Sequence, residues 1–384
     1  MAKKKKVVLK GLSEKEEIIR KINEKYKGGF LLSGNNDIFK SPPRIITGIL
    51  PVDMVTYGGI PAQKITMMWG KFSSGKSYVA YKTGASAQRL CRECYTELVY
   101  TEDGKKCPNC GGEKPMSVMI VDMENSYDRE WAARIGMIVD DVLVLRPEYG
   151  EQMVDIVDDT IRNQLVDLII IDSIAATIPT VEIVNSAENQ QQGVAARLLN
   201  KAFRKWPSSQ LAVYSEGGTP ATLIVINQIR EKIGIIYGSS DTAPGGRGQE
   251  FVTHLRLKMF GKSYIFIGDN ASEKEPIGRT VGVRVDKSKC SPAMEETEFP
   301  IYYRDTDKTI SGDNGENVAI VKSALEEGII YREKASKPYK LEFDDAMEFK
   351  TQKVILEKLD TDIEFRSNLR AATLEHYIDR RLNR

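Results

Sequence analysis

Stretches of apolar residues alternate with amphipathic stretches from about residue 45 to residue 300. Seven of the apolar stretches have the length of buried strands, and they lie at 64–69, 117–122, 142–145, 167–172, 222–227, 252–259 and 280–285. Several are apolar without interruption, which is typical of parallel strands that are covered on both faces. The pattern therefore predicts an α/β fold with a central, mostly parallel sheet.

The N-terminal part of the chain has a different pattern. Residues 13–26 predict one amphipathic helix, because four apolar residues fall on a single stripe: Ile18, Ile19, Ile22 and Tyr26. Ser13 and Glu16 form a capping box at its start. This helix has little chain of its own to pack on, so it docks either on the parent core or on a neighbouring subunit. We assign residues 1–33 to an N-terminal oligomerisation arm.

The pattern changes again towards the C-terminus. It predicts, in order, a helix, a hairpin-like stretch and two polar helices, at 316–327, 329–343, 347–358 and 361–382. We therefore expect a core over residues 34–312, followed by a small C-terminal domain over residues 313–384.

Composition and charge narrow the class of protein. The 384 residues are 41% apolar and 28% charged, and 55 basic residues balance 54 acidic ones, giving a net charge of +1. A globally basic protein is excluded, so any contact with nucleic acid must come from local patches. The run Lys3–Lys6 reads as a solvated terminus. No apolar stretch approaches the roughly 18 residues of a membrane span, and no signal-peptide pattern is present, so we expect a cytoplasmic protein with reduced cysteines.

A complete GxxxxGK[ST] phosphate loop follows the first buried strand and precedes a helical stretch. Its residues are Gly70, Lys71, Phe72, Ser73, Ser74, Gly75, Lys76 and Ser77. The flanking strand and helix argue against a chance match, because in that context backbone N–H groups and the helix N-terminus surround phosphate oxygens. Lys76 would reach the β- and γ-phosphates, and Ser77 would hold Mg²⁺. The loop predicts binding of a nucleoside triphosphate.

Two further strands end in acidic residues. The stretch 168–172 ends at Asp172, whose carboxylate would order Mg²⁺ through water at the carboxyl end of the sheet. Glu124 follows the strand at 117–122 and is our candidate for orienting or deprotonating the attacking water. Without the other two motifs, Glu124 would read as a solvated loop residue.

The strand at 222–227 runs into Asn227 and Gln228. An uncharged amide at this position can sense a γ-phosphate by hydrogen bonding. A loop-like stretch over 234–248 follows, and it is too long to be an idle connection. The direct succession predicts coupling between nucleotide state and order of the loop.

These residues together resemble the bacterial RecA-type homologous recombinases over about residues 15–305. The most specific segments are GKFSSGKS, VDMEN, IIIDSIAA, GVAARLLNKAFRK, INQIREKIGIIYG and the Gly245–Gly246 step. The resemblance implies a RecA-like P-loop ATPase core that uses ATP and Mg²⁺. It also implies a helical filament on single-stranded DNA that pairs with a homologous duplex and exchanges strands, with single-strand-binding and loading proteins as possible partners. Such a protein would act in a bacterial cytoplasm, or in that of a virus-infected bacterium.

The resemblance also implies roles for single residues. Glu124 matches the residue that activates water, and Gln228 matches the γ-phosphate sensor. Trp131 falls where the family stacks an aromatic ring on adenine, although a tryptophan on a helix is more often a core residue. Lys287 and Lys289 match a lysine pair that reaches the ATP of the adjacent subunit; from sequence alone this pair would pass for a solvated loop.

The family's DNA contacts come from two loops, which correspond here to about 182–193 and 230–246. The residues expected to neutralise DNA phosphates are Arg197, Arg204, Arg230 and Lys232. Ile233 and Ile235 would wedge between groups of stacked bases, and Gly245 and Gly246 belong to the second loop. Arg197 and Arg204 are spaced seven apart, so they also fit an ordinary amphipathic helix face.

A CxxC pair followed after 12 residues by a second CxxC pair interrupts the core, and it is formed by Cys91, Cys94, Cys107 and Cys110. Most relatives have a short turn there. Four reduced thiolates at this spacing suit a structural Zn²⁺ site, with a small hairpin between the pairs that turns at Asp103–Gly104. Two disulfides are the alternative, and they suit neither the compartment nor the close pairs. What the insertion (residues 91–112) touches, DNA or a partner, is open. Cys290 reads as an unpaired packing residue.

Other departures leave alternatives open. Glu250 stands where the family commonly has a basic interface residue, and the C-terminal residues 379–384 lack the acidic tail that restrains DNA entry in many relatives; if that tail is a brake, this protein loads more readily.

A RadA-type ring-forming helicase or branch-migration ATPase is one alternative function, although its zinc module precedes the core. A recombination mediator without strand exchange is the other.

Overall fold

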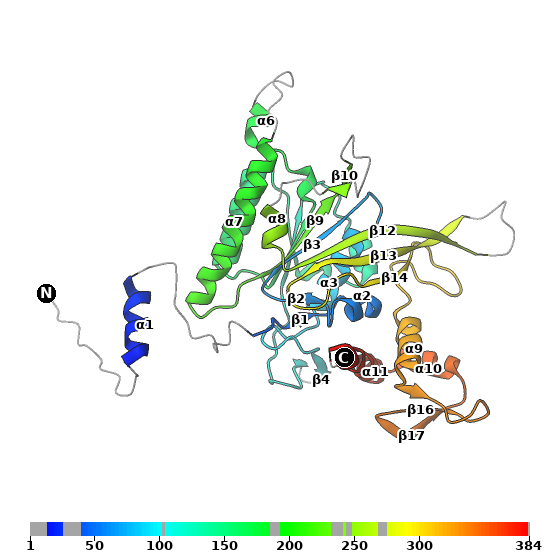
Figure 1. The fold of residues 1–384 in the computed structure, drawn as a ribbon. Coiled ribbons are helices and arrows are strands. Elements are labelled where there is room, and N and C mark those ends of the chain that lie inside the picture. The colour runs from blue at the N-terminus through cyan, green and yellow to red at the C-terminus, as the bar shows by residue number, and fades with distance from the viewer. Residues whose placement is uncertain are drawn as a thin grey trace.

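The computed structural model describes residues 14–25, 40–101, 104–184, 193–231, 241–242, 248–267 and 275–382. An eight-stranded sheet forms the centre of the molecule, with helices on both faces (Figure 1). Its strand order is β14-β13-β12-β3-β9-β8-β6-β7. The α/β fold with a central, mostly parallel sheet is thus confirmed.

Six neighbouring strands of the sheet run parallel. They are β3 (Ile65–Gly70), β6 (Val118–Asp122), β7 (Val142–Leu145), β8 (Leu168–Asp172), β9 (Thr222–Gln228) and β12 (Leu255–Phe266). We call the edge at which β3, β6, β8 and β9 end the phosphate edge, and the edge at which they begin the opposite edge. β13 (Pro276–Ser288) and β14 (Glu296–Tyr302) continue the sheet in antiparallel pairing.

The predicted strands all exist; 142–145 has the expected bounds, and the others have shifted ends. β12 begins at Leu255 rather than at 252, because Val252 closes a short helix, α8 (Gly248–Val252). β14 was not predicted. Phe299 and Ile301 are its buried residues and alternate with partly exposed ones, so this edge strand has no continuous apolar stretch.

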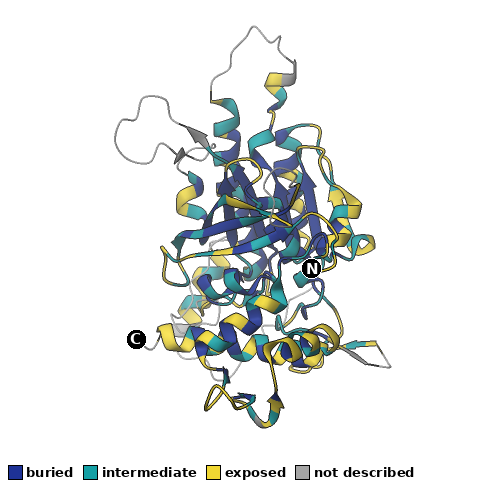
Figure 2. Cartoon of the chain, turned by 90° about the vertical axis from the view of Figure 1, so that its right-hand side faces the viewer, coloured by how far each residue is buried: buried dark blue, intermediate teal, exposed yellow. Residues whose placement is uncertain are grey.

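Helices cover the sheet on both sides and create two separate hydrophobic clusters. α3 (Lys76–Ala87) and α4 (Arg129–Ile135) pack on the face that carries Leu168 and Ile170. α5 (Gly150–Arg162) and α7 (Val194–Ser215) cover the face that carries Ile169 and Ile171. Because both faces are covered, every residue of β8 is buried, and buried residues fill the centre of the molecule (Figure 2). This explains the uninterrupted apolar stretches.

Short elements connect these layers. Strands β1 (Arg44–Ile45) and β2 (Ile60–Pro61) pair around α2 (Leu50–Val55), and single 3-10 turns lie at Val139–Asp141 and Ile174–Ala176. Helix α6 (Thr180–Val184) precedes α7, and β10 (Arg230–Glu231) pairs with β11 (Asp241–Thr242). In the cysteine insertion, β4 (Val99–Thr101) and β5 (Gly104–Lys106) form the expected small hairpin.

The C-terminal part contains α9 (Glu316–Glu327), a three-stranded sheet, α10 (Gln352–Thr361) and α11 (Ile363–Leu382). The strands are β15 (Ile330–Tyr331), β16 (Tyr339–Leu341) and β17 (Asp344–Phe349). The predicted helix start at 347 is wrong, because residues 344–349 pair with β16 as a third strand. The helix begins only after Thr351, whose hydroxyl accepts a hydrogen bond from the Val354 N–H.

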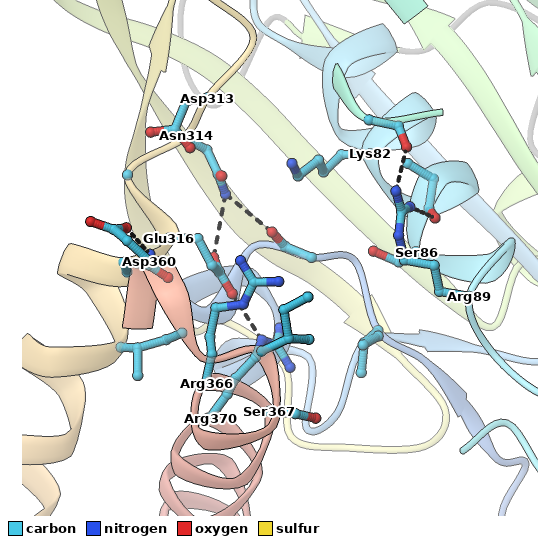
Figure 3. Close-up of a pocket in the computed structure, with 18 of the residues that line it drawn as sticks. Lys82, Ser86, Arg89, Asp313, Asn314, Glu316, Asp360, Arg366, Ser367 and Arg370 are labelled. Atoms are coloured by element: carbon cyan, nitrogen blue, oxygen red, sulfur yellow. Dashed lines mark hydrogen bonds and ion pairs between the residues drawn. The ribbon is translucent and has the colours of Figure 1, made fainter. Parts of the chain in front are cut away.

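A buried ion-pair network joins the C-terminal helices to α2. Arg370 of α11 contacts Asp53 of α2, and its Nε lies 2.8 Å from Glu316 Oε1 of α9. Beside this network is a cleft of about 540 Å³, with Lys82 and Ser86 on the α3 side and Asp313, Asn314 and Arg366 on the other (Figure 3). How the chain divides into domains stays a prediction.

The N-terminal helix α1 (Glu14–Lys25) agrees with the expected bounds, while Ser13 and Tyr26 lie outside the described residues. Its apolar stripe is not covered by the parts of the chain that the structure describes, since Ile18 is 52% exposed and Ile22 is 37% exposed. Among the described residues, no helix is both long enough and apolar enough to cross a membrane.

Candidate nucleotide site and neighbouring surfaces

The phosphate loop lies at the phosphate edge, between β3 and α3. Gly70 ends the strand, and Gly75 caps the helix with a φ of 82°, in the left-handed region that favours glycine. A Cβ at Gly75 would crowd Val281 and Ile301, and one at Gly70 would collide with the Met259 carbonyl of β12. Both glycines are therefore required by close approach of the neighbouring strands.

Lys76 is the first residue of α3, and its side chain folds over the loop. Its Nζ donates hydrogen bonds to the carbonyls of Gly70 at 3.1 Å and Lys71 at 2.7 Å. Burial lowers the pKa of Lys76, while the nearby carboxylates of Asp172 and Glu124 act in the opposite direction. The ammonium is thus held at the mouth of the loop, where a triphosphate would meet it.

Asp172 ends β8 beside the loop and is 5% exposed. Burial raises the pKa of its carboxyl group to about 6, although a hydrogen bond with the Ser77 side chain opposes that rise. A hydroxyl and a carboxylate oxygen side by side are the ligands that Mg²⁺ prefers. Ser77 and Asp172 therefore fit the metal site expected from the sequence.

Glu124 lies just after β6 and receives hydrogen bonds from two other strand ends. Its Oε1 accepts from Gln228 Nε2 at 3.0 Å and from Ser173 Oγ at 2.5 Å. The structure thus brings Glu124 and Gln228 together, as the ends of β6, β8 and β9 meet. Sequence reasoning missed Ser173, although its place directly after Asp172 was the available signal.

Asn227 links the end of β9 to helix α8. It is fully buried, its Nδ2 donates to Gln249 Oε1 at 3.2 Å, and its Oδ1 accepts from the Gln228 N–H at 2.9 Å. The segment between Gln228 and α8 is the one expected to contact DNA. Both ends of that segment are therefore tied to the strand that carries Gln228.

Trp131 lies on α4 and is partly buried against the hydrophobic cluster on the face of the sheet that α3 and α4 cover. Its ring centroid is 6.4 Å from that of Tyr78, at an interplanar angle of 49°. The position is compatible both with a packing role and with an adenine contact beside α3, so the assignment stays a prediction.

The lysine pair lies away from the phosphate loop of its own chain. Lys287 on β13 is opposite Arg256 in the sheet. The Lys289 N–H donates to the His254 carbonyl, and the His254 N–H in turn donates to the Ile65 carbonyl at the start of β3. Five residues of β3 span about 17 Å to Gly70. The Lys287 Nζ contacts the Glu250 carbonyl, and the Lys289 Nζ lies 2.8 Å from that of Phe251.

The expected DNA-binding residues are described only in part. Arg197 and Arg204 are both exposed on α7. The backbone of Arg230 lies in β10, at the phosphate edge two residues after Gln228. The other candidates lie outside the described residues: Lys232, Ile233, Ile235, Gly245 and Gly246.

The four cysteines of the insertion gather at one point. All four sulfur atoms lie within 4.8 Å of one another, with Sγ–Sγ distances of 3.5 Å for Cys91–Cys110 and 3.4 Å for Cys94–Cys107. Disulfide sulfurs are about 2.05 Å apart, whereas thiolates around one zinc ion at about 2.3 Å are roughly 3.8 Å apart. All four cysteines are free. A hydrogen bond with Thr96 lowers the pKa of Cys94 to about 6, whereas hydrogen bonds with the neighbouring cysteines outweigh that with the Gly112 backbone and raise the pKa of Cys110 to about 12. Without a metal ion the four sulfurs therefore do not all favour the thiolate.

The cysteine insertion is anchored at the opposite edge of the sheet. Arg92 Nη2 lies 3.0 Å from Asp167 Oδ1, directly before β8 begins. On its other side, Ser367 of α11 donates a 2.9 Å hydrogen bond to Glu97. The insertion therefore contacts α11 and is separated by the length of the strands from the backbone of Arg230 at the phosphate edge.

Comparison with known proteins identifies relatives of this chain. The family model of the RecA N-terminal domain matches residues 109–307. The protein RecA of Fusobacterium nucleatum is 35% identical over 260 residues, which are 67% of this chain and 60% of that protein. RecA of Aquifex aeolicus is 35% identical over 260 residues, or 65% of its length. RecA of Desulforapulum autotrophicum is 33% identical over 298 residues, or 76% of each chain. The match to the Fusobacterium protein thus spans less than two thirds of that protein's length.

Proposed function

The chain belongs to the RecA family, and on this premise we propose that it is an ATP-dependent DNA recombinase. It would assemble as a helical filament on single-stranded DNA and catalyse pairing and strand exchange with a homologous duplex. The observation that carries the proposal is the meeting of Lys76, Asp172, Glu124 and Gln228 at one edge of the sheet. The bacterial source of the relatives supports action in a bacterial cell.

Each residue at this edge has a distinct part in ATP hydrolysis. Lys76 and the loop N–H groups would bind the phosphates, and Ser77 with Asp172 would hold Mg²⁺, which screens the phosphate charge when bound. Glu124 would orient the attacking water and accept its proton. The hydrogen bond from Ser173 keeps the Glu124 carboxylate turned towards this space.

Gln228 would couple the nucleotide to DNA. Its amide now donates to Glu124, and a γ-phosphate offers that donor a competing, more highly charged acceptor. A change of partner at Gln228 would move the start of the segment that leads from β9 to α8. By reciprocity, DNA bound to that segment should tighten the binding of ATP.

Lys287 and Lys289 would act on a neighbouring subunit. They lie on the opposite edge from their own phosphate loop, so they are available to a nucleotide clamped between two subunits. Cations delivered in this way stabilise charge on the phosphoryl group and tie hydrolysis to assembly. The exposed apolar stripe of α1 supports a contact between subunits as well.

The cysteine insertion would hold one structural Zn²⁺. Four sulfur ligands leave no position open for a water or a substrate, which is the pattern of a structural site. The ion would fix the hairpin that contacts α11.

Strand exchange by the full chain, compared with Lys76→Ala, tests the proposal. We expect helical polymers on an oligonucleotide with a non-hydrolysable ATP analogue, and exchange of a homologous strand with ATP. Closed hexameric rings in electron micrographs would instead indicate a motor, and ATP binding without exchange would indicate a mediator.

A further inference from the structure

Arg279 approaches the phosphate loop from β13 and was not expected from the sequence. Its Nη1 donates a 3.0 Å hydrogen bond to the carbonyl oxygen of Ser73, inside the loop. β13 thus carries cations at both of its ends: Lys287 towards the opposite edge and Arg279 at the phosphate loop of its own chain. We propose that Arg279 is a positioning residue, which holds the Ser73–Ser74 peptide in the orientation that binds phosphate. The inference rests on the proposed binding of ATP.

The geometry of the peptide bond explains how such a contact would act. In a planar trans peptide the C=O and the following N–H point in opposite directions. With the Ser73 carbonyl held towards Arg279, the Ser74 N–H points away from it, towards the side where the loop's N–H groups surround a phosphate. A cationic donor on the carbonyl also polarises the peptide and strengthens the N–H as a donor.

The surrounding strands make room for this guanidinium. A Cβ at Gly261 on β12 would overlap the Arg279 Nη2, Cζ and Nε atoms. Farther along β12, Tyr264 is the residue paired with Arg279, and the guanidinium carbon lies 5.2 Å from the centre of its ring. The missing side chain at Gly261 leaves space for the planar guanidinium, and the ring of Tyr264 holds it in place.

The backbone of Ser73 shows why the peptide needs an external support. Ser73 has a φ of 54°, in the left-handed region that is unfavourable for a residue with a side chain. A hydrogen bond from a charged group offsets this cost and selects one orientation. Val281, two residues after Arg279, packs against Gly75, so β13 contacts the loop at two points.

A double-mutant cycle between Arg279 and Gly261 tests the inference. The affinity of each full-length variant for a fluorescent ATP analogue with Mg²⁺ is measured without DNA. We expect Arg279→Ala and Gly261→Ala each to weaken binding about tenfold, the scale of one hydrogen bond from a charged donor. The double variant should bind like Arg279→Ala alone, because the three atoms nearest to the added methyl group all belong to the guanidinium that Arg279→Ala removes.

Lys262→Ala is the matched control. Lys262 is next to Gly261 on the same strand but pairs with Glu298, away from the loop, so its loss should leave ATP affinity unchanged. In hydrolysis, Arg279→Ala should raise KM about tenfold and change kcat less than twofold, since phosphate contacts hold ground state and transition state alike. Arg279→Lys, which keeps the charge without the fork, should fall between wild type and Arg279→Ala.

The outcomes separate the two proposals. Unfolding temperatures without nucleotide should agree within about 2 °C among the variants, because the added methyl displaces only a side-chain end. If wild type binds ATP, and both Arg279→Ala and Arg279→Lys bind ATP as tightly as wild type does, the inference is wrong while the proposed function stands. Losses that add in the double variant, or that follow lowered unfolding temperatures, also overturn it. A wild-type protein without ATP affinity would overturn both.

Discussion

Gln228 Nε2 donates a 3.0 Å hydrogen bond to Glu124 Oε1, although the two residues are 104 positions apart in the chain. One side chain is expected to sense the nucleotide and the other to activate water. Gln228 Nε2 carries two N–H donors, so a γ-phosphate would either replace Glu124 as its acceptor or share the amide with it. The contact therefore joins the chemistry of hydrolysis to the segment that follows β9.

Replacing Gln228 by alanine should uncouple DNA from hydrolysis. The Gln228→Ala protein should bind ATP within about threefold of wild type, since Lys76 and the loop supply the phosphate contacts, but should lose stimulation by single-stranded DNA. The measurement is steady-state ATP turnover with and without DNA. Glu124→Gln is the comparison: it should lose turnover by at least about 100-fold under both conditions. Full DNA stimulation in Gln228→Ala would refute the coupling route.

The raised pKa of Asp172 predicts a pH dependence of Mg²⁺–ATP binding. Burial raises this pKa to about 6, and the metal requires the charged carboxylate. At pH 5 about one tenth of the groups are ionised, so affinity should be about tenfold lower than at pH 7.5. Asp172→Asn should bind more weakly at pH 7.5 and lack this step. The step surviving in Asp172→Asn would assign it to another group, such as the nucleotide itself.

The Asp172 carboxyl group makes the free energy of unfolding fall as pH rises, whereas a salt-bridged carboxyl group makes it rise. Its pKa is raised from 3.8 to about 6 on folding, so the folded protein holds the proton more tightly than the unfolded chain. Stability from this group is present below pH 4 and is lost as pH rises to about 6. Without nucleotide, Asp172→Asn should therefore be more stable than wild type at pH 7 and not at pH 4, as measured by urea unfolding.

Zinc in the cysteine insertion should be measurable by metal analysis. We expect one zinc per chain in wild type and none in Cys107→Ser, whose unfolding temperature should fall by about 5 °C or more because metal binding contributes folding free energy. Cys290→Ser is the matched control, since Cys290 is a free cysteine outside the cluster. A metal-free wild type, or equal zinc content in Cys107→Ser, would exclude the site.

Removing Arg370 should destabilise the attachment of the C-terminal helices. The side chain is 12% exposed, and its loss leaves the fully buried Asp53 without a cationic partner. We expect Arg370→Ala to lower the free energy of unfolding at pH 7 by about 3–5 kcal/mol. The deficit should shrink at lower pH, because burial already raises the pKa of Asp53 and protonation removes the unpaired charge.

Arg304→Ala is the control for that measurement. Arg304 forms an exposed pair with Glu275, and such pairs contribute only about 0–1 kcal/mol. Equal losses for the two variants would show that the Arg370 network adds no more than a surface pair.

The sequence by itself determined the strands buried on both faces, the phosphate loop and the cysteine spacing. Each of these is a local pattern: a continuous apolar stretch such as 168–172, eight consecutive residues, or two CxxC pairs. Strands β14 and β17 were not predicted from the sequence, because each is only partly buried and carries polar residues. No continuous apolar stretch therefore marks either strand.

Only the tertiary structure decided which distant residues meet. Glu124 follows β6 and Gln228 ends β9; these strands are not adjacent, and β8 between them brings Ser173 to the same carboxylate. Arg279 reaches Ser73 across 206 positions, and Arg370 reaches Asp53 across 317. Such contacts depend on strand order and on how the layers pack, and these follow from the total burial of the chain rather than from any local window of its residues.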